Sequence, residues 1–334
     1  MKPAHIFFAL VITLLFNGCA QKVTVKALEP AEINGAASTK NIAVTPFRND
    51  YVNLADKIEV SISKQRIDGK PYFKVVNRTD IDKIITEQKL QNSGLIDEST
   101  AVEVGNLLGA QAIISGSINA PTMSNTGYFV TRKKCKGKGD ARVCWDVKVA
   151  CQKRAIGLSA QIRMVNVSTS AVIYADSITN QKEWRRCADS STALPSKQAG
   201  TQYLANAMAN NFAYKLTPHY RNITVSLLED PDMEYSDHQE KLLENALLYI
   251  EHGRYDKAEK LLRRLLESTA SQSYVPLYNI GVIYEARGNF AEAQHYYKTA
   301  DELTIEPVKV INTAIVRIQS LIEKEKLAQA QIAK

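Results

Sequence analysis

Residues 99–118 read STAVEVGNLLGAQAIISGSI, in which a polar start leads through a glycine into a nearly unbroken apolar run. Ser99 is a favourable first residue for a helix that runs through Val102 and Leu107. Gly109 can close this helix in the left-handed conformation that glycine adopts readily. Residues 111–118 are apolar almost throughout, which is typical of a strand buried on both faces of a sheet. A helix followed directly by such a strand predicts a layered α/β fold.

The sequence on either side continues the alternation of strands and helices. Residues 40–47 alternate and end at a proline, and residues 54–62 repeat leucine or isoleucine at helical spacing. Residues 72–77 predict a second strand, and residues 79–85 predict a threonine-capped helix. Farther along the chain, the pattern predicts two strands within 158–177, an alanine-rich helix over 198–216 and a last strand over 223–228.

Three segments in this region carry a family resemblance: residues 73–81, 84–90 and 105–117. Their order and spacing resemble the periplasmic domain of the curli-secretion family, CsgG/HfaB, and residues 158–177 continue the match. The resemblance implies a mixed sheet with flanking helices over residues 40–230. Relatives of this fold include secretion-channel subunits, flagellar-base lipoproteins and activators of cell-wall synthases, so the resemblance identifies a fold more sharply than a function.

The N-terminal residues have the features of an export signal. Lys2 gives a basic start, residues 6–16 form an apolar run too short to span a bilayer comfortably, and Gly18 places a small residue before Cys19. This pattern resembles the bacterial lipobox, although Phe16 stands where leucine is usual.

The lipobox resemblance implies a signal peptide at residues 1–18 and fatty acids such as palmitate on Cys19. Ala20 stands where an inner-membrane retention signal has aspartate, so the resemblance implies an outer-membrane lipoprotein that faces the periplasm. An uncleaved signal anchor is the alternative. Residues 19–39 mix polar and small residues without a sustained period, which predicts a tether.

The overall charge limits the classes of partner. The formal net charge is +7 and 45% of the residues are hydrophobic, so the chain can bury two cores. An exported protein rarely meets nucleic acid, and no basic helix or aromatic-interleaved basic stripe is present, so we expect no nucleic-acid partner. Anionic lipid headgroups or cell-wall polymer are better matches for this charge.

Two inserts interrupt the α/β domain, at residues 121–154 and 182–197. A turn at residues 139–140 makes the first insert a β-hairpin in which Tyr128 lies opposite Cys151, and Cys135 opposite Cys144. The other opposed pairs in this register are Val130 with Val149, Arg132 with Val147, and Lys134 with Trp145.

The same register predicts the disulfide bonds. Apart from Cys19, the chain has four of its five cysteines in the two inserts. The hairpin pairs Cys135 with Cys144 and leaves Cys151 for Cys187, which would tie the two inserts together. No Cys-x-x-Cys spacing is present, which disfavours a zinc cluster or a redox-active pair. We therefore expect no metal site.

The two inserts also show whether this chain could form a membrane pore. Secretion members of the resembled family form barrels from two hairpins in this domain. A membrane-crossing hairpin needs about 9–11 residues per strand and one uncharged face. Neither face of the first insert is long and uncharged, and the second insert carries several charges and Pro195. These features favour a scaffold over a channel.

The pattern changes after an acidic, proline-bearing break at residues 229–232, and residues 231–334 then repeat themselves. The first copy has Leu242, Ala246, Tyr249, Gly253, Tyr255, Ala258, Leu262 and Leu265. About 35 positions later, the second has Leu277, Gly281, Tyr284, Gly288, Phe290, Ala293, Tyr297 and Ala300. This period and the placement of small residues and aromatics resemble tetratricopeptide (TPR) repeats. Pro307 begins a capping helix, so we expect an all-α helical-repeat domain after the α/β domain.

No catalytic constellation is present in the sequence. The five histidines are scattered, and no nucleophile, base and orienting group can be assembled, so we expect neither an enzyme nor a cofactor. The repeats offer a concave face for a peptide or helix, with Asn279, Arg287 and His295 as candidate partner-binding surface residues.

These observations favour a non-catalytic outer-membrane lipoprotein that acts as a scaffold or assembly factor. It would use the α/β domain for homo-oligomerisation or docking, and the repeats for periplasmic or envelope proteins. The alternatives are a subunit of a CsgG-like secretion channel and an activator of a cell-wall synthase.

Overall fold

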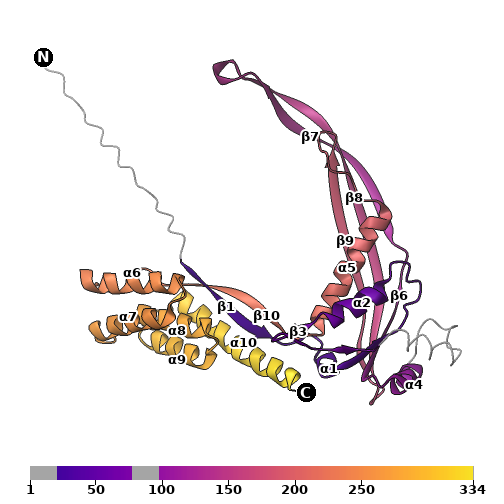
Figure 1. The fold of residues 1–334 in the computed structure, drawn as a ribbon. Helices are drawn as coiled ribbons and strands as arrows, with labels where there is room; N and C mark the ends of the chain where they lie inside the picture. The colour runs from indigo at the N-terminus through magenta and orange to yellow at the C-terminus, as the bar shows by residue number, and fades with distance from the viewer. Residues whose placement is uncertain (1–20, 77–97, 334) are drawn as a thin grey trace. The chain divides into compact units, whose positions relative to one another are not determined.

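The computed structural model describes residues 21–76 and 98–333, and it describes no side chains for residues 98–101 (Figure 1). The described residues form two compact units. Residues 28–219 and 324–333 make an α/β unit, and residues 21–27 and 220–323 make a helical unit. Cys19 and the helix predicted to begin at Thr79 lie outside the described residues. No helix within the described ranges is long and apolar enough to cross a membrane.

The α/β unit contains a six-stranded mixed sheet, as the sequence predicts. The strands lie in the order β5-β2-β6-β8-β7, and β9 pairs with β8. β2 is parallel to β5 and β6, whereas all pairs that involve β8 are antiparallel. The strands are β2 (Asn41–Val44), β5 (Lys74–Val75), β6 (Ala112–Ile118), β7 (Thr122–Lys136), β8 (Val143–Asn166) and β9 (Val172–Cys187).

Helices cover both faces of the sheet core. Because side chains alternate along a strand, Ile114 of β6 points into one cluster and Ile113 into another. The first cluster includes apolar residues of α2 and α5, such as Ile58 and Phe212, and the second includes Val104 of α4. The helices are α1 (Asn34–Ala37), α2 (Leu54–Ser63), α4 (Glu98–Leu108) and α5 (Lys197–Lys215), and a small hairpin joins β3 (Arg66–Ile67) to β4 (Lys70–Pro71).

The predicted end of α4 is confirmed. Gly109 follows the last residue of this helix and has a φ of +63°, which lies in the left-handed region that favours glycine. β6 follows with all seven residues buried, as the apolar run predicts.

β8 is a 24-residue strand that connects the sheet core to the first insert. Residues 160–166 pair with β6, and residues 143–157 pair with β7. On its other edge, β8 pairs with β9 from Cys151 to Val165. Figure 1 shows the β7–β8 hairpin continuing past the end of β9. We call residues 129–150, where only two strands are paired, the arm.

The last residues of α10 (Lys309–Ile332) belong to the α/β unit and are held by buried polar contacts. The Gln331 side chain accepts a hydrogen bond from the Ala31 backbone N–H at 2.8 Å and donates to the Asn34 side chain at 3.0 Å. Tyr72 and Lys40 both reach the Gln331 carbonyl, at 3.1 and 3.2 Å. Burial lowers the pKa of Lys40 to about 8 and raises that of Tyr72 to about 12, because water is partly excluded here.

The helical unit begins with two strands, which corrects the prediction of a tether over residues 19–39. β1 (Lys22–Glu29) and β10 (His219–Ser226) form a two-stranded sheet. Val23, Val25 and Ala27 alternate with polar residues and pack in the same core as the helices. The α/β domain therefore does not extend to residue 230 as expected, because β10 lies with the helical unit apart from its first residue.

The helical unit contains the two predicted helical pairs and a longer final helix. Gly281 of one helix lies against Tyr297 of the next, and a Cβ at residue 281 would meet this ring at 2.6 Å. A small residue is therefore required at this crossing. The helices are α6 (Asp237–Glu251), α7 (Tyr255–Ser268), α8 (Tyr274–Ala286), α9 (Phe290–Glu302) and α10.

A buried ion pair joins α8 to α10 in this core. Glu285 is fully buried, and Arg317 donates to its two carboxylate oxygens at 2.8 and 2.9 Å. The Tyr297 hydroxyl donates to the same carboxylate from α9. Burial and the neighbouring carboxylate raise the pKa of Tyr297 well above its usual value, so the phenol remains a donor.

We predict that Glu285→Gln lowers the free energy of unfolding of the helical unit by about 3–5 kcal/mol, because it leaves Arg317 without its charged partner. The double variant Glu285→Leu/Arg317→Leu should recover much of this loss, since both charges are then removed. Urea unfolding followed by circular dichroism measures both effects. Glu244→Gln, at an exposed position on α6, is the control. An effect of Glu285→Gln equal to that of the control would contradict the prediction.

Candidate functional site

The arm has the register that the sequence predicts. Tyr128 lies opposite Cys151, and Cys135 lies opposite Cys144, across a turn that contains a short 3₁₀ segment at Gly139–Ala141. The other predicted pairs are also present: Val130 with Val149, Arg132 with Val147, and Lys134 with Trp145. The second insert is not a separate hairpin, because residues 182–187 complete β9.

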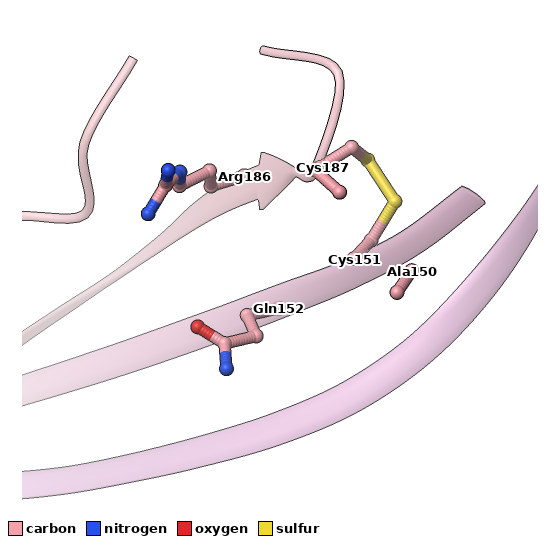
Figure 2. Close-up of a pocket in the computed structure, with 6 residues that line it drawn as sticks. Ala150, Cys151, Gln152, Arg186 and Cys187 are labelled. Carbon is pink, nitrogen blue, oxygen red and sulfur yellow. A yellow bond between two sulfur atoms is a disulfide. The ribbon is translucent and has the colours of Figure 1, made fainter. Parts of the chain in front are cut away.

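Both predicted disulfides are present. Cys135–Cys144 closes the tip of the arm, and Cys151–Cys187 joins β8 to the end of β9. Figure 2 shows the second bond beside Gln152 and Arg186, which pair across the same two strands. These residues line a depression of about 260 Å³. The Cys151–Cys187 bond marks the point at which the sheet narrows from three strands to two.

The outer part of the arm is exposed and basic. All residues from 131 to 146 are exposed to solvent. Residues 131–148 contain seven Lys or Arg and two Asp, so their formal charge is 7 − 2 = +5. At the base of this segment, Arg132 forms an ion pair with Asp189 at 3.0 Å. The arm therefore carries most of a positive excess that is +7 for the whole chain.

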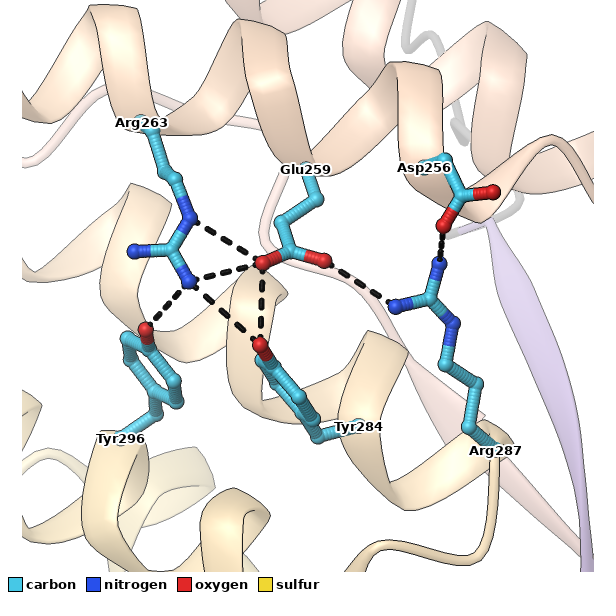
Figure 3. Close-up of polar contacts among 6 residues, drawn as sticks. All are labelled: Asp256, Glu259, Arg263, Tyr284, Arg287 and Tyr296. Atoms are coloured by element: carbon cyan, nitrogen blue, oxygen red, sulfur yellow. Dashed lines mark hydrogen bonds and ion pairs between the residues drawn. The ribbon is translucent and has the colours of Figure 1, made fainter.

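A polar network joins the two helical pairs of the helical unit (Figure 3). Glu259 on α7 accepts hydrogen bonds from Arg263, Tyr284 and Arg287 at 2.7–3.0 Å. Arg287 also pairs with Asp256, and Arg263 donates to Tyr296. Burial alone would raise the pKa of Glu259, but these hydrogen bonds and the charges of both arginines hold it below its usual value of 4.5.

The three candidate partner-binding residues do not form one surface. Asn279 is fully buried, which corrects its prediction as a surface residue. Its side-chain amide instead holds the backbone of Leu228, accepting from the N–H at 3.0 Å and donating to the carbonyl at 2.8 Å. Arg287 forms ion pairs with Asp256 and Glu259 of the same unit. His295 is exposed, with its ring edge-on to Tyr296.

No group of three or more potential metal ligands lies close together within residues 21–76 and 98–333. The candidate sites are the exposed surfaces of the arm and of the helical pairs. The sequence signalled the Glu259 network only through the i,i+4 spacing of Glu259 and Arg263, which is typical of a helical ion pair. Its other members come from helices α8 and α9.

Comparison with known families agrees with this architecture. Residues 63–211 match the family model described as curli production assembly/transport component CsgG. Residues 276–304 match a tetratricopeptide-repeat model. The chain therefore joins a region that matches CsgG to a region that matches a tetratricopeptide repeat. No curated protein matches it.

The two matches have different extents. The CsgG match spans residues from α2 to α5 and includes the arm, and the TPR match covers α8 and α9. α6 and α7 precede this repeat as a second helical pair, as the first copy of the repeat predicts. Both families are generally non-enzymatic, and CsgG proteins are associated with the envelope or outer membrane. Together, the domains suggest a role in protein interaction or envelope assembly.

We predict that the two disulfides contribute unequally to stability. They close segments of 9 and 36 residues, for which the chain-entropy relation gives about 3 and about 4 kcal/mol. Cys151→Ser/Cys187→Ser should therefore lower the free energy of unfolding more than Cys135→Ser/Cys144→Ser. Equilibrium urea unfolding measures both variants. The reverse order would contradict a structural role for the bond at the base of the arm.

We also predict that the Glu259 network weakens in acid. The folded-state pKa of Glu259 lies below its unfolded value, so its contribution is complete above about pH 4.5 and is lost as the pH falls through the folded pKa. Wild-type stability should therefore fall more than that of Glu259→Gln between neutral pH and about pH 3. Urea unfolding over this range compares them. Parallel pH profiles would show that Glu259 makes no such contribution.

Proposed function

We propose that this protein is a non-catalytic, lipid-anchored scaffold or assembly factor of an envelope complex. It resides at the outer membrane, faces the periplasm and binds protein partners through its TPR region and its CsgG domain. The observation that carries this proposal is the presence in one chain of the CsgG match at residues 63–211 and the TPR match at residues 276–304. A TPR region presents helical surfaces to protein segments, and a CsgG domain is an envelope module.

The disulfides support an oxidising compartment. Cys135–Cys144 lies in a fully exposed part of the arm, where a cytosolic reductant would reach it. Two such bonds are expected to persist in a periplasm and not in a cytosol. A periplasmic location agrees with the proposed acylation of Cys19. The lipid on Cys19 keeps the folded units close to the membrane.

A CsgG-like channel subunit is the second candidate, and the length of the β-strands favours it. β7 has 15 residues and β9 has 16, which exceeds the roughly 9–11 residues that cross an outer membrane. The charged side chains on the arm disfavour a channel subunit. Thr131 and Lys133 face Lys148 and Asp146 on one side of the arm, and Arg132 and Lys134 lie on the other. An Arg or Lys at the bilayer midplane costs about 2–4 kcal/mol, so neither face suits the lipid core.

An activator of a cell-wall synthase is also compatible with this structure. It would differ from the proposed scaffold only in the identity of its protein partner. An exposed position on the helical unit can be used to capture that partner. Leu248 on α6 has an exposed fraction of 48%, and Val60 on α2, at 49%, is the matched control position.

We predict that labelled palmitate is incorporated into the wild-type chain in cells and not into Cys19→Ser. A photocrosslinking amino acid at residue 248 should capture discrete envelope proteins, and the same group at residue 60 should capture fewer. Mass spectrometry identifies the products. Absence of palmitate together with freely alkylatable thiols in whole cells would overturn the proposed location. Detergent-extracted rings that conduct ions in planar bilayers would support the channel instead.

A further inference from the structure

The two faces of the arm tip differ in composition because the register fixes which side chains lie together. Directly opposed residues of an antiparallel pair share a face, and successive residues alternate between faces. One face therefore carries three cations on β7 beside three apolar residues on β8. We call it the cationic face, and it consists of Arg132, Lys134, Lys136, Val143, Trp145 and Val147. No carboxylate occupies any of these six positions.

The side chains of the cationic face are available to a partner. Val143 and Trp145 are 65% and 46% exposed, so a partner can contact both side chains. Lys134 and Lys136 are exposed and form no ion pair with any residue that the structure describes. Only Arg132, at the base of the face, is paired, with Asp189. The Cys135–Cys144 bond holds the two strands together beside these residues.

From this juxtaposition, we infer that the cationic face binds the surface of a bilayer that carries anionic headgroups. The row of cations matches the charge of lipid phosphates, and each Lys or Arg near such a surface adds to the attraction. The neighbouring apolar row can enter the region of the headgroups, where tryptophan is favoured because its ring is amphipathic. An acidic protein surface would satisfy the cations and leave Val143 and Trp145 in contact with polar groups. A bilayer surface satisfies both rows.

This binding is peripheral and does not require the arm to cross the membrane. Lys133, Asp146 and Lys148 lie on the opposite face and remain in water when the cationic face lies against the headgroups. A cationic patch with apolar neighbours adds an electrostatic attachment to that of a lipid anchor. The inference stands without acylation, because it rests on residues of the arm alone.

The test uses unacylated residues 20–334, which include every described helix and strand, and flotation with vesicles. Phosphatidylcholine vesicles with about one-third phosphatidylglycerol should bind the protein, and pure phosphatidylcholine vesicles should not. Lys134→Glu/Lys136→Glu should lower binding at least about tenfold, since two attractive charges become repulsive. Lys257→Glu/Lys260→Glu makes the same change of charge at exposed positions on α7 and should bind as wild type. Higher salt should weaken wild-type binding, because exposed charges are screened.

A fluorescence measurement reports the position of the arm directly. The chain has two tryptophans, so Trp184→Phe leaves Trp145 as the only one. Its emission should shift to shorter wavelength on anionic vesicles and be quenched by brominated lipids. Equal flotation of the tip variant and its α7 control, or unchanged Trp145 emission on vesicles that bind the protein, would overturn the inference. Retention on polyglutamate without flotation on anionic vesicles would also overturn it, and would indicate an acidic protein partner. Failure of partner capture in cells would bear on the proposed function and leave this vesicle result unaffected.

Discussion

The α/β unit depends on the hydrogen-bonded register of β8. This strand of 24 residues pairs with β6, β7 and β9, so a single backbone connects the sheet core to the arm. Because side chains alternate with a period of two, a shift by one residue would move every side chain of β8 to the other face. Ile156 and Leu158 would leave the core shared with α2 and α5, and Cys151 would no longer lie opposite Cys187. Core packing and the disulfides therefore require the same register.

The register of β8 also determines the chemistry of the arm. Where helices cover the sheet, one face of the strand is apolar and buried. Past the Cys151–Cys187 bond, no third strand is present, and hydrogen bonding within the hairpin and the tip disulfide maintain its structure. This leaves an exposed surface with a high density of positive charge. The helical unit contributes a second kind of surface, in which polar groups such as Glu259 and Asn279 bind other groups of the same unit.

Much of the architecture was predictable from the sequence because its signals are local. The strand β6, the end of α4 at Gly109 and the hairpin register all follow from spacing within a few tens of residues. β1 was missed because Lys22, Thr24 and Lys26 made residues 22–27 look polar, although the alternate positions are apolar. Its partner β10 lies about 200 residues later, and this pairing has no local signal. Asn279 was misplaced for a related reason, since its burial depends on the backbone of Leu228, which lies 51 residues earlier.

The most direct test of the β8 register is disulfide mapping of the unreduced protein by proteolysis and mass spectrometry. This register requires two linked peptide pairs, one that joins Cys135 to Cys144 and one that joins Cys151 to Cys187. A peptide that joins Cys135 to Cys187, or Cys144 to Cys151, would contradict it, because β8 could not then be aligned with both of its neighbours as the structure shows.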